Sequence, residues 1–432
     1  MTVWKECGIA MAFTKKSTAD VVVIGGGAAG MFASIQAARR GLRVLLLEKN
    51  PACGKKLLIT GKGRCNVTNN CPPEEVLKNV PRNGRFLYSS VYAFPPEAAM
   101  AFFEENGCAL KTEHGNRVFP VSDRSMDVLN ALLRAMRAAG VQHRQGSAQH
   151  ILTENGQVCG VQTAEEMISC RAAILCTGGA SYPLTGSTGD GFRMAAALGH
   201  TITPVAGSLV PLVSEDADCA QMQGLSLRNT AFRLLDSRGK TVYSDFGELL
   251  FTHFGVSGPM ALSASAHMKP GIQYTILLDL KPALDEATLD ARFLRDFEKY
   301  SNRSMENALA DLYPHSMIPV LLSRAGIDPA LRANSLSKAQ RRALLEHTKR
   351  FAISVSGTRP VAEAIVTRGG VAVREIDPKT MQSKLVPGLF FAGEVIDCDA
   401  YTGGFNLQIA WSTGCAAANS CAAFLENYSS GD

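Results

Sequence analysis

The chain has 432 residues, of which 46% are hydrophobic and 19% charged, and its formal net charge is +5. This composition excludes a disordered or low-complexity protein, and no apolar run approaches the roughly 18 residues of a membrane-spanning helix. The 12 cysteines are irregularly spaced, so we expect reduced thiols, a cytoplasmic location and no metal site.

The first 19 residues lack the pattern of a regular element. Their apolar run, Ile9–Phe13, is shorter than the roughly 7–15 residues of a signal-peptide core. We therefore expect residues 1–19 to form a disordered leader, with Met11 as an alternative start of the chain.

A strand–helix–strand unit begins at Asp20. The β-branched run 20–25 predicts a buried strand, and 42–48 predict a second one. Between them, the small residues of 26–40 predict a helix that ends at Gly41. Parallel strands joined by a helix are the building unit of a doubly wound α/β sheet.

The turn between the first strand and the helix carries the pattern G-x-G-x-x-G at Gly25, Gly27 and Gly30. The first glycine allows a tight turn, the second lets a pyrophosphate approach the backbone, and the third lets the helix pack on the strand. Glu48 ends the second strand, where its carboxylate can accept hydrogen bonds from an adenosine ribose. The same carboxylate would repel a 2′-phosphate, so we expect FAD or NAD in this site rather than NADP.

The remainder of the chain alternates between patterns typical of helices and patterns typical of strands. Helices are expected at 97–107 and 125–139, and a small antiparallel meander at 141–170. A buried strand is expected at 172–179, and a long helix of small residues at 405–424.

This order predicts an α/β domain made of both chain ends with a two-part insertion between them. The expected domain parts are residues 20–204 and 351–432 for the dinucleotide-binding domain, 205–282 for a β-rich insertion and 283–350 for a helical insertion.

Four longer stretches resemble one known family of flavoproteins. They are GKKLLITGKGRCNVTN (54–69), CTGGASYPLTGSTGDGFRMAAALGH (176–200), GELLFTHFGVSGPMAL (247–262) and PKTMQSKLVPGLFFAGEVIDCDAYTGGFNLQIAWSTG (378–414). With them, the chain from about residue 20 to 424 is similar to the bacterial NAD(P)/FAD-dependent oxidoreductases called aminoacetone-oxidase-like. That family includes bile-acid reductases and a flavoprotein that forms dihydrouridine in ribosomal RNA. The resemblance implies a Rossmann-like FAD-binding domain interrupted by a β-barrel-like domain and a helical domain.

The resemblance also implies that the cofactor is FAD. The turn after the strand at 389–395 would meet the ribityl chain. Backbone N–H groups at the start of the last helix would face the flavin N1–C2=O edge, where negative charge collects on reduction. The expected FAD-binding residues are Gly25, Gly27, Ala28, Ala29, Gly30, Glu48, Lys49, Lys55, Arg64, Cys65, Asn66, Ala148, Thr177, Gly178, Gly179, Gly393, Glu394, Gly404, Phe405, Asn406, Leu407 and Gln408.

Two residues are candidates for proton transfer. Cys65 lies in the polar segment 62–66 and could protonate one carbon of a double bond while hydride reaches the other, although a small buried packing residue is the alternative. His253 lies in a glycine-flanked loop and is the second candidate. A redox pair of Cys65 with Cys71 is a further alternative, but its C-x5-C spacing differs from the C-x4-C of disulfide-reducing flavoproteins.

The expected reaction is reduction of a carbon–carbon double bond in a small conjugated substrate, enone or steroid-like, with NADH or NADPH as electron donor. Reduction of uridine to dihydrouridine in ribosomal RNA and oxygen-dependent amine oxidation are the alternatives. A flavin-bound RNA-binding factor without turnover is a non-enzymatic one. The basic stretch 337–350, with five basic residues and one acid, fits an RNA backbone, but a solvated helix surface also explains it.

Overall fold

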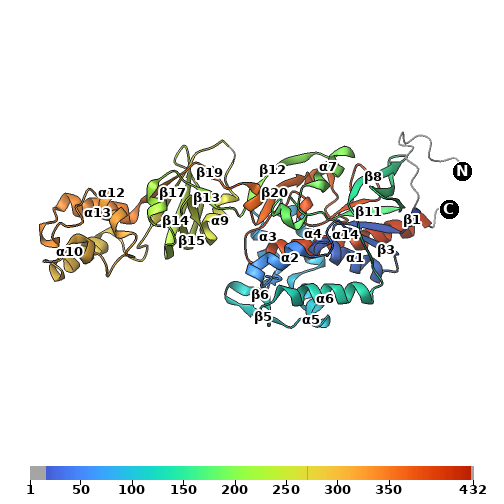
Figure 1. The fold of residues 1–432 in the computed structure, drawn as a ribbon, viewed down its shortest axis with the longest axis horizontal. Helices are drawn as coiled ribbons and strands as arrows, with labels where there is room; N and C mark the ends of the chain where they lie inside the picture. The colour runs from blue at the N-terminus through green and yellow to red at the C-terminus, as the bar shows by residue number, and fades with distance from the viewer. Residues whose placement is uncertain (1–15, 270, 430–432) are drawn as a thin grey trace. The chain divides into compact units, whose positions relative to one another are not determined.

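The computed structural model describes residues 16–269 and 271–429, which fall into two compact units. The first unit combines residues up to Ala206 with residues from Val366 onward, and the second is Gly207–Ile365 (Figure 1). The first unit is therefore built from both ends of the chain. The alternative start at Met11 lies outside the described residues.

A five-stranded parallel sheet forms the centre of the first unit. In sheet order its strands are β21 (Leu389–Phe391), β11 (Ala172–Leu175), β2 (Val21–Ile24), β3 (Val44–Glu48) and β7 (Gln142–Gln145). Every residue of the first four strands is buried, which explains their nearly continuous apolar sequences. The predicted α/β class with a Rossmann-like sheet is confirmed.

Two helices pack together against this sheet. Helix α1 (Ala28–Arg39) connects β2 to β3, and α14 (Phe405–Ser429) follows the last strand. The rings of Phe32 on α1 and Trp411 on α14 lie 5.6 Å apart, and both side chains are fully buried. Among the described residues, no helix is both long and apolar enough to cross a membrane.

The other elements of the first unit connect and flank the central sheet. Between β3 and β7 lie α2 (Lys55–Ile59), β4 (Thr68–Asn69), α3 (Pro73–Lys78), α4 (Tyr88–Ala93), α5 (Pro96–Glu105), β5 (Leu110–Glu113), β6 (Arg117–Pro120) and α6 (Ser125–Ala138). A four-stranded sheet has the order β1 (Lys16–Thr18), β10 (Met167–Ser169), β9 (Gln157–Thr163) and β8 (Ala148–Glu154). Helix α7 (Asp190–Ala197) and strand β12 (Ile202–Ser208) lead into the second unit in sequence. Strand β20 (Val366–Val371), which pairs with β12, follows the second unit.

Two segments differ from the sequence-based expectation. Lys16–Thr18, expected within the disordered leader, forms strand β1 parallel to β10, because Ser17 Oγ donates to Glu166 Oε2 at 3.0 Å and the backbone pairs in register. Residues 1–15 lie outside the described residues. Strand β7, expected in the meander, instead pairs with β3 and extends the parallel sheet.

A seven-stranded sheet organises the second unit. Its order is β18 (Phe351–Val355), β17 (Tyr274–Asp279), β14 (Ser226–Asp236), β15 (Thr241–Thr252), β16 (Gly255–Ser257), β13 (Leu212–Val213) and β19 (Gly357–Thr358). The helices of this unit are α8 (Ala217–Gln221), α9 (Pro259–Ser265), α10 (Glu286–Lys299), α11 (Met305–Ala308), α12 (Ile318–Arg324) and α13 (Lys338–Lys349).

The strands and helices of the second unit share one hydrophobic core. Phe232 and Ile276 from the sheet join Phe293, Leu321 and Leu344 from the helices in a single buried cluster. Strand β18 pairs with β17 along five residues, so the chain returns to the first unit after Ile365, rather than after Arg350 as expected from the sequence.

Candidate functional site

The three fingerprint glycines have different surroundings in the turn after β2. A Cβ on Gly25, whose φ is +104°, would lie 2.6 Å from the carbonyl oxygen of Cys176, and one on Gly30 would lie 1.8 Å from the carbonyl oxygen of Gly25. Both positions therefore need glycine for packing within the protein. A Cβ on Gly27 would meet no heavy atom within 4 Å. The open space at Gly27 lies at the start of α1, where backbone N–H groups and the helix dipole favour a phosphate.

Glu48, at the end of β3, holds this turn in place through hydrogen bonds. Its Oε2 accepts a hydrogen bond from the backbone N–H of Gly26 at 2.7 Å. Its Oε1 accepts from the backbone N–H and the side-chain amide of Asn50, both at 2.7 Å. The side chain is 7% exposed, so the carboxylate sits beside the fingerprint turn with little solvent around it. The backbone carbonyl of Glu48 accepts from Gly146, two residues before Ala148 begins β8.

The two lysines expected at the cofactor are engaged by protein groups. Lys49 Nζ donates to Thr188 Oγ1 at 2.6 Å and pairs with Asp190. Lys55 Nζ donates to Asn50 Oδ1 at 3.2 Å. The contacts of Lys49 tie the loop after β3 to α7 and to the loop before it.

Two buried oxygen atoms at the expected FAD site have no hydrogen-bond partner among the described residues. They are Thr177 Oγ1, two residues after β11, and Asn66 Oδ1, two residues before β4. Buried polar atoms are nearly always hydrogen-bonded in folded proteins. Thr177 Oγ1 lies against α7, since a Cβ on Gly191 would be 2.0 Å from it. A ligand with N–H or O–H donors would satisfy Asn66 Oδ1. Together with the open side of Gly27, the Asn66 oxygen fits FAD.

Gly178 and Gly179 continue the chain beyond Thr177 at the carboxyl edge of the sheet, where α/β proteins bind ligands. Gly178 has a φ of +70°, which favours glycine. A Cβ on Gly179 would lie 2.2 Å from Thr367 Oγ1 and 2.9 Å from Glu394 Oε1. The loop is therefore held tightly against β20 and the turn that contains Glu394.

Glu394 lies in the 3-10 turn Gly393–Val395 and is held by three residues. Lys56 Nζ donates to its Oε2 at 2.8 Å, while the Thr367 backbone N–H and Ser181 Oγ donate to its Oε1 at 2.6 and 3.1 Å. Burial opposes ionisation, but the charge and hydrogen bond of Lys56 and the bonds from Thr367 outweigh it and lower the pKa of the carboxyl. Sequence reasoning missed Lys56 and Thr367. The sequence GKK at 54–56 marks Lys56 as a candidate, but no local signal marks Thr367.

The start of α14 packs against β4. A Cβ on Gly404, whose φ is +99°, would lie 2.3 Å from the carbonyl carbon and oxygen of Thr68. Asn406 accepts from the Ala400 backbone N–H at 2.9 Å and donates to the Ala400 carbonyl at 2.7 Å. Gln408 is fully buried, and its Oε1 accepts from Thr68 Oγ1 at 2.6 Å. Asn406 and Gln408 thus hold the approach to the helix in place.

Five further expected residues have packing contacts in the first unit. Ala29 and Phe405 are buried in its core, and Ala28, Ala148 and Leu407 pack against that core. Gly393 has a φ of +73°, and a Cβ there would lie 2.8 Å from the Ala29 Cβ. This close approach locks the 3-10 turn onto α1.

Arg64 links β5 to the turn that follows β6. Its Nε donates to Asp123 Oδ1 at 2.8 Å, and its guanidinium also pairs with Glu113. The guanidinium lies 4.1 Å from the centre of the Phe119 ring. These contacts favour a structural role for Arg64 over a direct contact with the cofactor.

Cys65 is fully buried in the core of the first unit. Burial raises the pKa of its thiol to about 12, against a smaller opposing effect of a hydrogen bond with Thr60. Cys71 is also a free thiol, and burial followed by the charge of Glu75 raises its pKa to about 11. Neither thiol is poised to form a thiolate near neutral pH, which disfavours the redox pair.

His253 lies in the second unit. It occupies the turn between β15 and β16 with Phe254, is exposed to solvent, and its ring centre is 5.0 Å from that of Phe254. The structure therefore places the two proton-transfer candidates in different units, one buried and one exposed.

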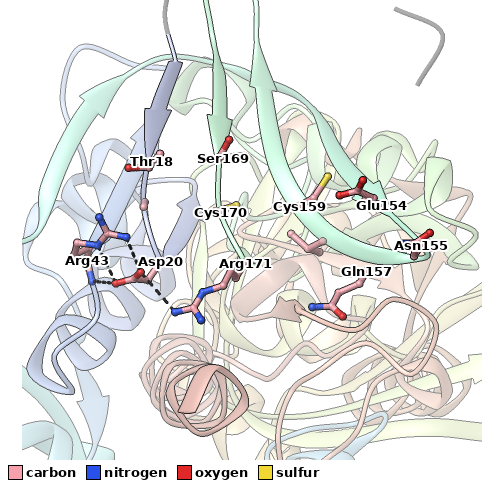
Figure 2. A pocket seen from close by; sticks show the side chains of 12 residues that line it. Thr18, Asp20, Arg43, Glu154, Asn155, Gln157, Cys159, Ser169, Cys170 and Arg171 are labelled. Atoms are coloured by element: carbon pink, nitrogen blue, oxygen red, sulfur yellow. Dashed lines mark hydrogen bonds and ion pairs between the residues drawn. The ribbon is translucent and has the colours of Figure 1, made fainter. Parts of the chain in front are cut away.

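A cavity of about 450 Å³ lies elsewhere in the first unit, at the amino ends of the parallel strands. Figure 2 shows Asp20 with its hydrogen bonds to Arg43 and its ion pair with Arg171 at this cavity. Asp20 precedes β2 and Arg171 precedes β11, so the cavity is at the opposite strand ends from Gly27 and Thr177. It is separate from the candidate cofactor site.

Known proteins resemble this chain over nearly its whole length. A family model described as HI0933-like protein Rossmann domain matches residues 19–420. The chain is 29% identical over 407 residues to a 3-dehydro-bile acid delta(4,6)-reductase of Clostridium scindens, covering 93% of this chain and 98% of that protein. It is 29% identical over 401 residues to a ribosomal RNA dihydrouridine synthase of Escherichia coli, covering 92% and 97%.

Two solved structures share the fold at a TM-score of 0.52. One is a 3-ketosteroid delta1-dehydrogenase of Sterolibacterium denitrificans, at 14% identity, covering 94% of this chain and 100% of that one. The other is a quinol-fumarate reductase, at 17% identity, covering 96% and 72%. At these identities the likeness concerns the fold alone.

Proposed function

The chain belongs to the HI0933-like Rossmann-domain family, and on that premise we propose that this FAD-dependent oxidoreductase reduces a carbon–carbon double bond conjugated to a carbonyl. The proposed substrate is small and enone or steroid-like, and the proposed donor is NADH or NADPH. The name of the Clostridium scindens relative supports this choice, because a 3-dehydro compound with delta(4,6) double bonds is such a conjugated ketone.

When bound, FAD supplies the capacity to accept a hydride and to deliver it to a polarised double bond. Gly27 and the start of α1 would hold the diphosphate, and Glu48 would accept from the ribose while it braces the fingerprint turn. Asn66 Oδ1 would accept a hydrogen bond that nothing else among the described residues supplies.

The contacts of the basic stretch support a small substrate over RNA. Arg341 pairs with Asp290 at 2.7 Å and Lys349 with Asp279 at 2.6 Å, and their side chains are 17% and 12% exposed. Arg350 pairs with Glu286 and Glu346 at 3.0 and 2.6 Å. Three of the five basic side chains in 337–350 are thus neutralised by acids within the same unit.

Uridine in ribosomal RNA is the second candidate substrate. The Escherichia coli relative, at the same identity and 97% coverage of that protein, carries the name of a ribosomal RNA dihydrouridine synthase. Uracil also has a double bond conjugated to a carbonyl, so the same hydride chemistry serves both substrates. Oxygen-dependent amine oxidation lacks such support.

Anaerobic stopped-flow spectroscopy tests the proposal. The FAD-loaded protein is reduced with NADH or NADPH, and its flavin absorbance is followed after addition of an enone steroid, ribosomal RNA or oxygen in separate experiments. We expect fast reoxidation by the steroid. Reoxidation by RNA alone would support uridine in ribosomal RNA as the substrate. Failure of both nicotinamides to reduce the flavin would refute NADH and NADPH as electron donors.

We propose that Cys65 is not the general acid of this reaction, because its thiol is buried and burial raises its pKa to about 12. A general acid contributes about 100-fold or more to a rate. Cys65→Ser is therefore expected to keep reduction by the nicotinamide and reoxidation by the enone within about 3-fold of the wild type, and to lower stability by about 1–2 kcal/mol. A loss of about 100-fold in reoxidation alone would reinstate Cys65 as the proton donor.

A further inference from the structure

Lys56 links its own helix, α2, to Glu394, which lies 338 residues further along the chain in the same unit. Its ammonium donates to Glu394 Oε2 at 2.8 Å, to Glu394 Oε1 at 3.2 Å and to Ser181 Oγ at 2.6 Å. These three contacts match the three N–H groups of an ammonium. Lys56 is thus fully committed to the loop after β11 and the turn after β21.

The partners of Lys56 extend the connection to β20. Glu394 Oε1 accepts from the Thr367 backbone N–H, and Thr367 Oγ1 accepts from the backbone N–H groups of Ala180 and Ser181 at 2.8 and 3.1 Å. The carboxylate and the threonine hydroxyl therefore fix Ala180 and Ser181. These residues directly follow Thr177, Gly178 and Gly179, the loop expected at the cofactor.

The same lysine is linked to the fingerprint turn at the other end of the site. Helix α2 begins after Gly54, whose backbone N–H donates to the Gly26 carbonyl at 2.8 Å. Gly26 is the residue that Glu48 also holds. A short path of backbone and side-chain bonds thus runs from the fingerprint turn through α2 and Lys56 to Glu394.

The ion pair is largely shielded from solvent, since the side chains of Lys56 and Glu394 are 22% and 19% exposed. Removing one member of such a pair leaves the other charge poorly solvated, and this is more disruptive than removing both. A surface pair has no comparable effect.

We propose that Lys56 is a positioning residue for FAD, which acts through Glu394 to hold the 177–181 loop and the fingerprint turn in the geometry that binds the cofactor. No direct contact of Lys56 with FAD is required. The proposal rests on FAD being the cofactor and is independent of the substrate.

The test measures FAD affinity by titrating the apoprotein while following flavin fluorescence, together with the apoprotein melting temperature. Lys56→Met is expected to weaken FAD binding at least 10-fold, and Lys56→Arg to restore it to within about 3-fold of the wild type. The double variant Lys56→Met/Glu394→Gln is expected to bind FAD better than Lys56→Met alone, because it leaves no unpaired carboxylate. Lys78→Met is the matched control, since it breaks an exposed lysine–glutamate pair, with Glu75, in the same unit.

Lys56→Met with an affinity within 2-fold of the wild type would overturn the proposal. So would equal losses in Lys56→Met and Lys56→Arg accompanied by equal falls in melting temperature, which would mark a general loss of stability. If Lys56→Met does not fold, the double variant decides: wild-type affinity there would exclude a positioning role for the pair. A wild-type apoprotein that binds no FAD would instead refute the cofactor assignment.

Discussion

Replacement of Gly27 with valine is expected to abolish FAD binding while the protein stays folded. The position has φ −79° and ψ −169°, which any residue adopts, and a Cβ there meets no protein atom within 4 Å. The cost to the fold is about 1 kcal/mol, from a poorer residue at the helix N-cap. The isopropyl group would occupy the space in front of α1 where the diphosphate is expected. The measurement is the flavin absorbance of the purified variant and its affinity for added FAD.

Gly30→Ala provides the contrasting variant three residues away. Its Cβ would lie 1.8 Å from the Gly25 carbonyl oxygen, so the strand and α1 would have to move apart. We expect a loss of about 3 kcal/mol in the free energy of unfolding, seen by denaturant titration. Retention of yellow colour by folded Gly27→Val would refute the diphosphate position, whereas a stable Gly30→Ala would refute the packing role.

Gly404→Ala is expected to be the most destabilising single-methyl substitution at the start of α14. The φ of +99° is unfavourable for alanine, and its Cβ would lie 2.3 Å from the Thr68 carbonyl group. Strain and overlap together are expected to lower the free energy of unfolding by about 3 kcal/mol or more. Because α14 and β4 would separate, FAD affinity should fall as well.

The matched control is Gly140→Ala, at the end of α6. This glycine also has a positive φ, +75°, but a Cβ there would meet nothing within 4 Å. Only the backbone penalty applies, so we expect a loss of about 1 kcal/mol. Equal losses in the two variants would show that the contact between Gly404 and Thr68 contributes nothing beyond backbone strain.

The lysines of α2 illustrate where sequence reasoning stops. Lys55 and Lys56 are neighbours in one motif, and the sequence predicts Lys55 at the cofactor. In the structure Lys55 bonds to nearby Asn50, whereas Lys56 reaches Glu394. The choice depends on which side of a five-residue helix faces a partner 338 residues away, and local composition carries no record of that.

The surroundings of Cys65 and of the basic stretch also depend on distant segments. The segment around Cys65 is polar and glycine-rich, but Gly61, Lys62 and Cys65 all have positive φ near +58°, and the thiol is fully buried. The basic side chains of α13 suggest a positive surface, yet Arg341 is neutralised by Asp290 on α10, 51 residues away. Composition reports which groups are present, whereas burial and pairing depend on distant segments.

The sequence alone predicted the strands β2, β3, β11 and β21, the fingerprint turn, α1 and the terminal position of Glu48, but not the fifth parallel strand, β7. These features depend on residues within one strand–helix–strand unit, where hydrophobic periodicity and glycine conformation act over short separations. The bonds of Glu394 with Lys56 and Thr367, the packing of Gly404 on Thr68 and the burial of Cys65 required the folded structure. Each depends on contacts that only the packing of distant segments creates, and no local pattern encodes them.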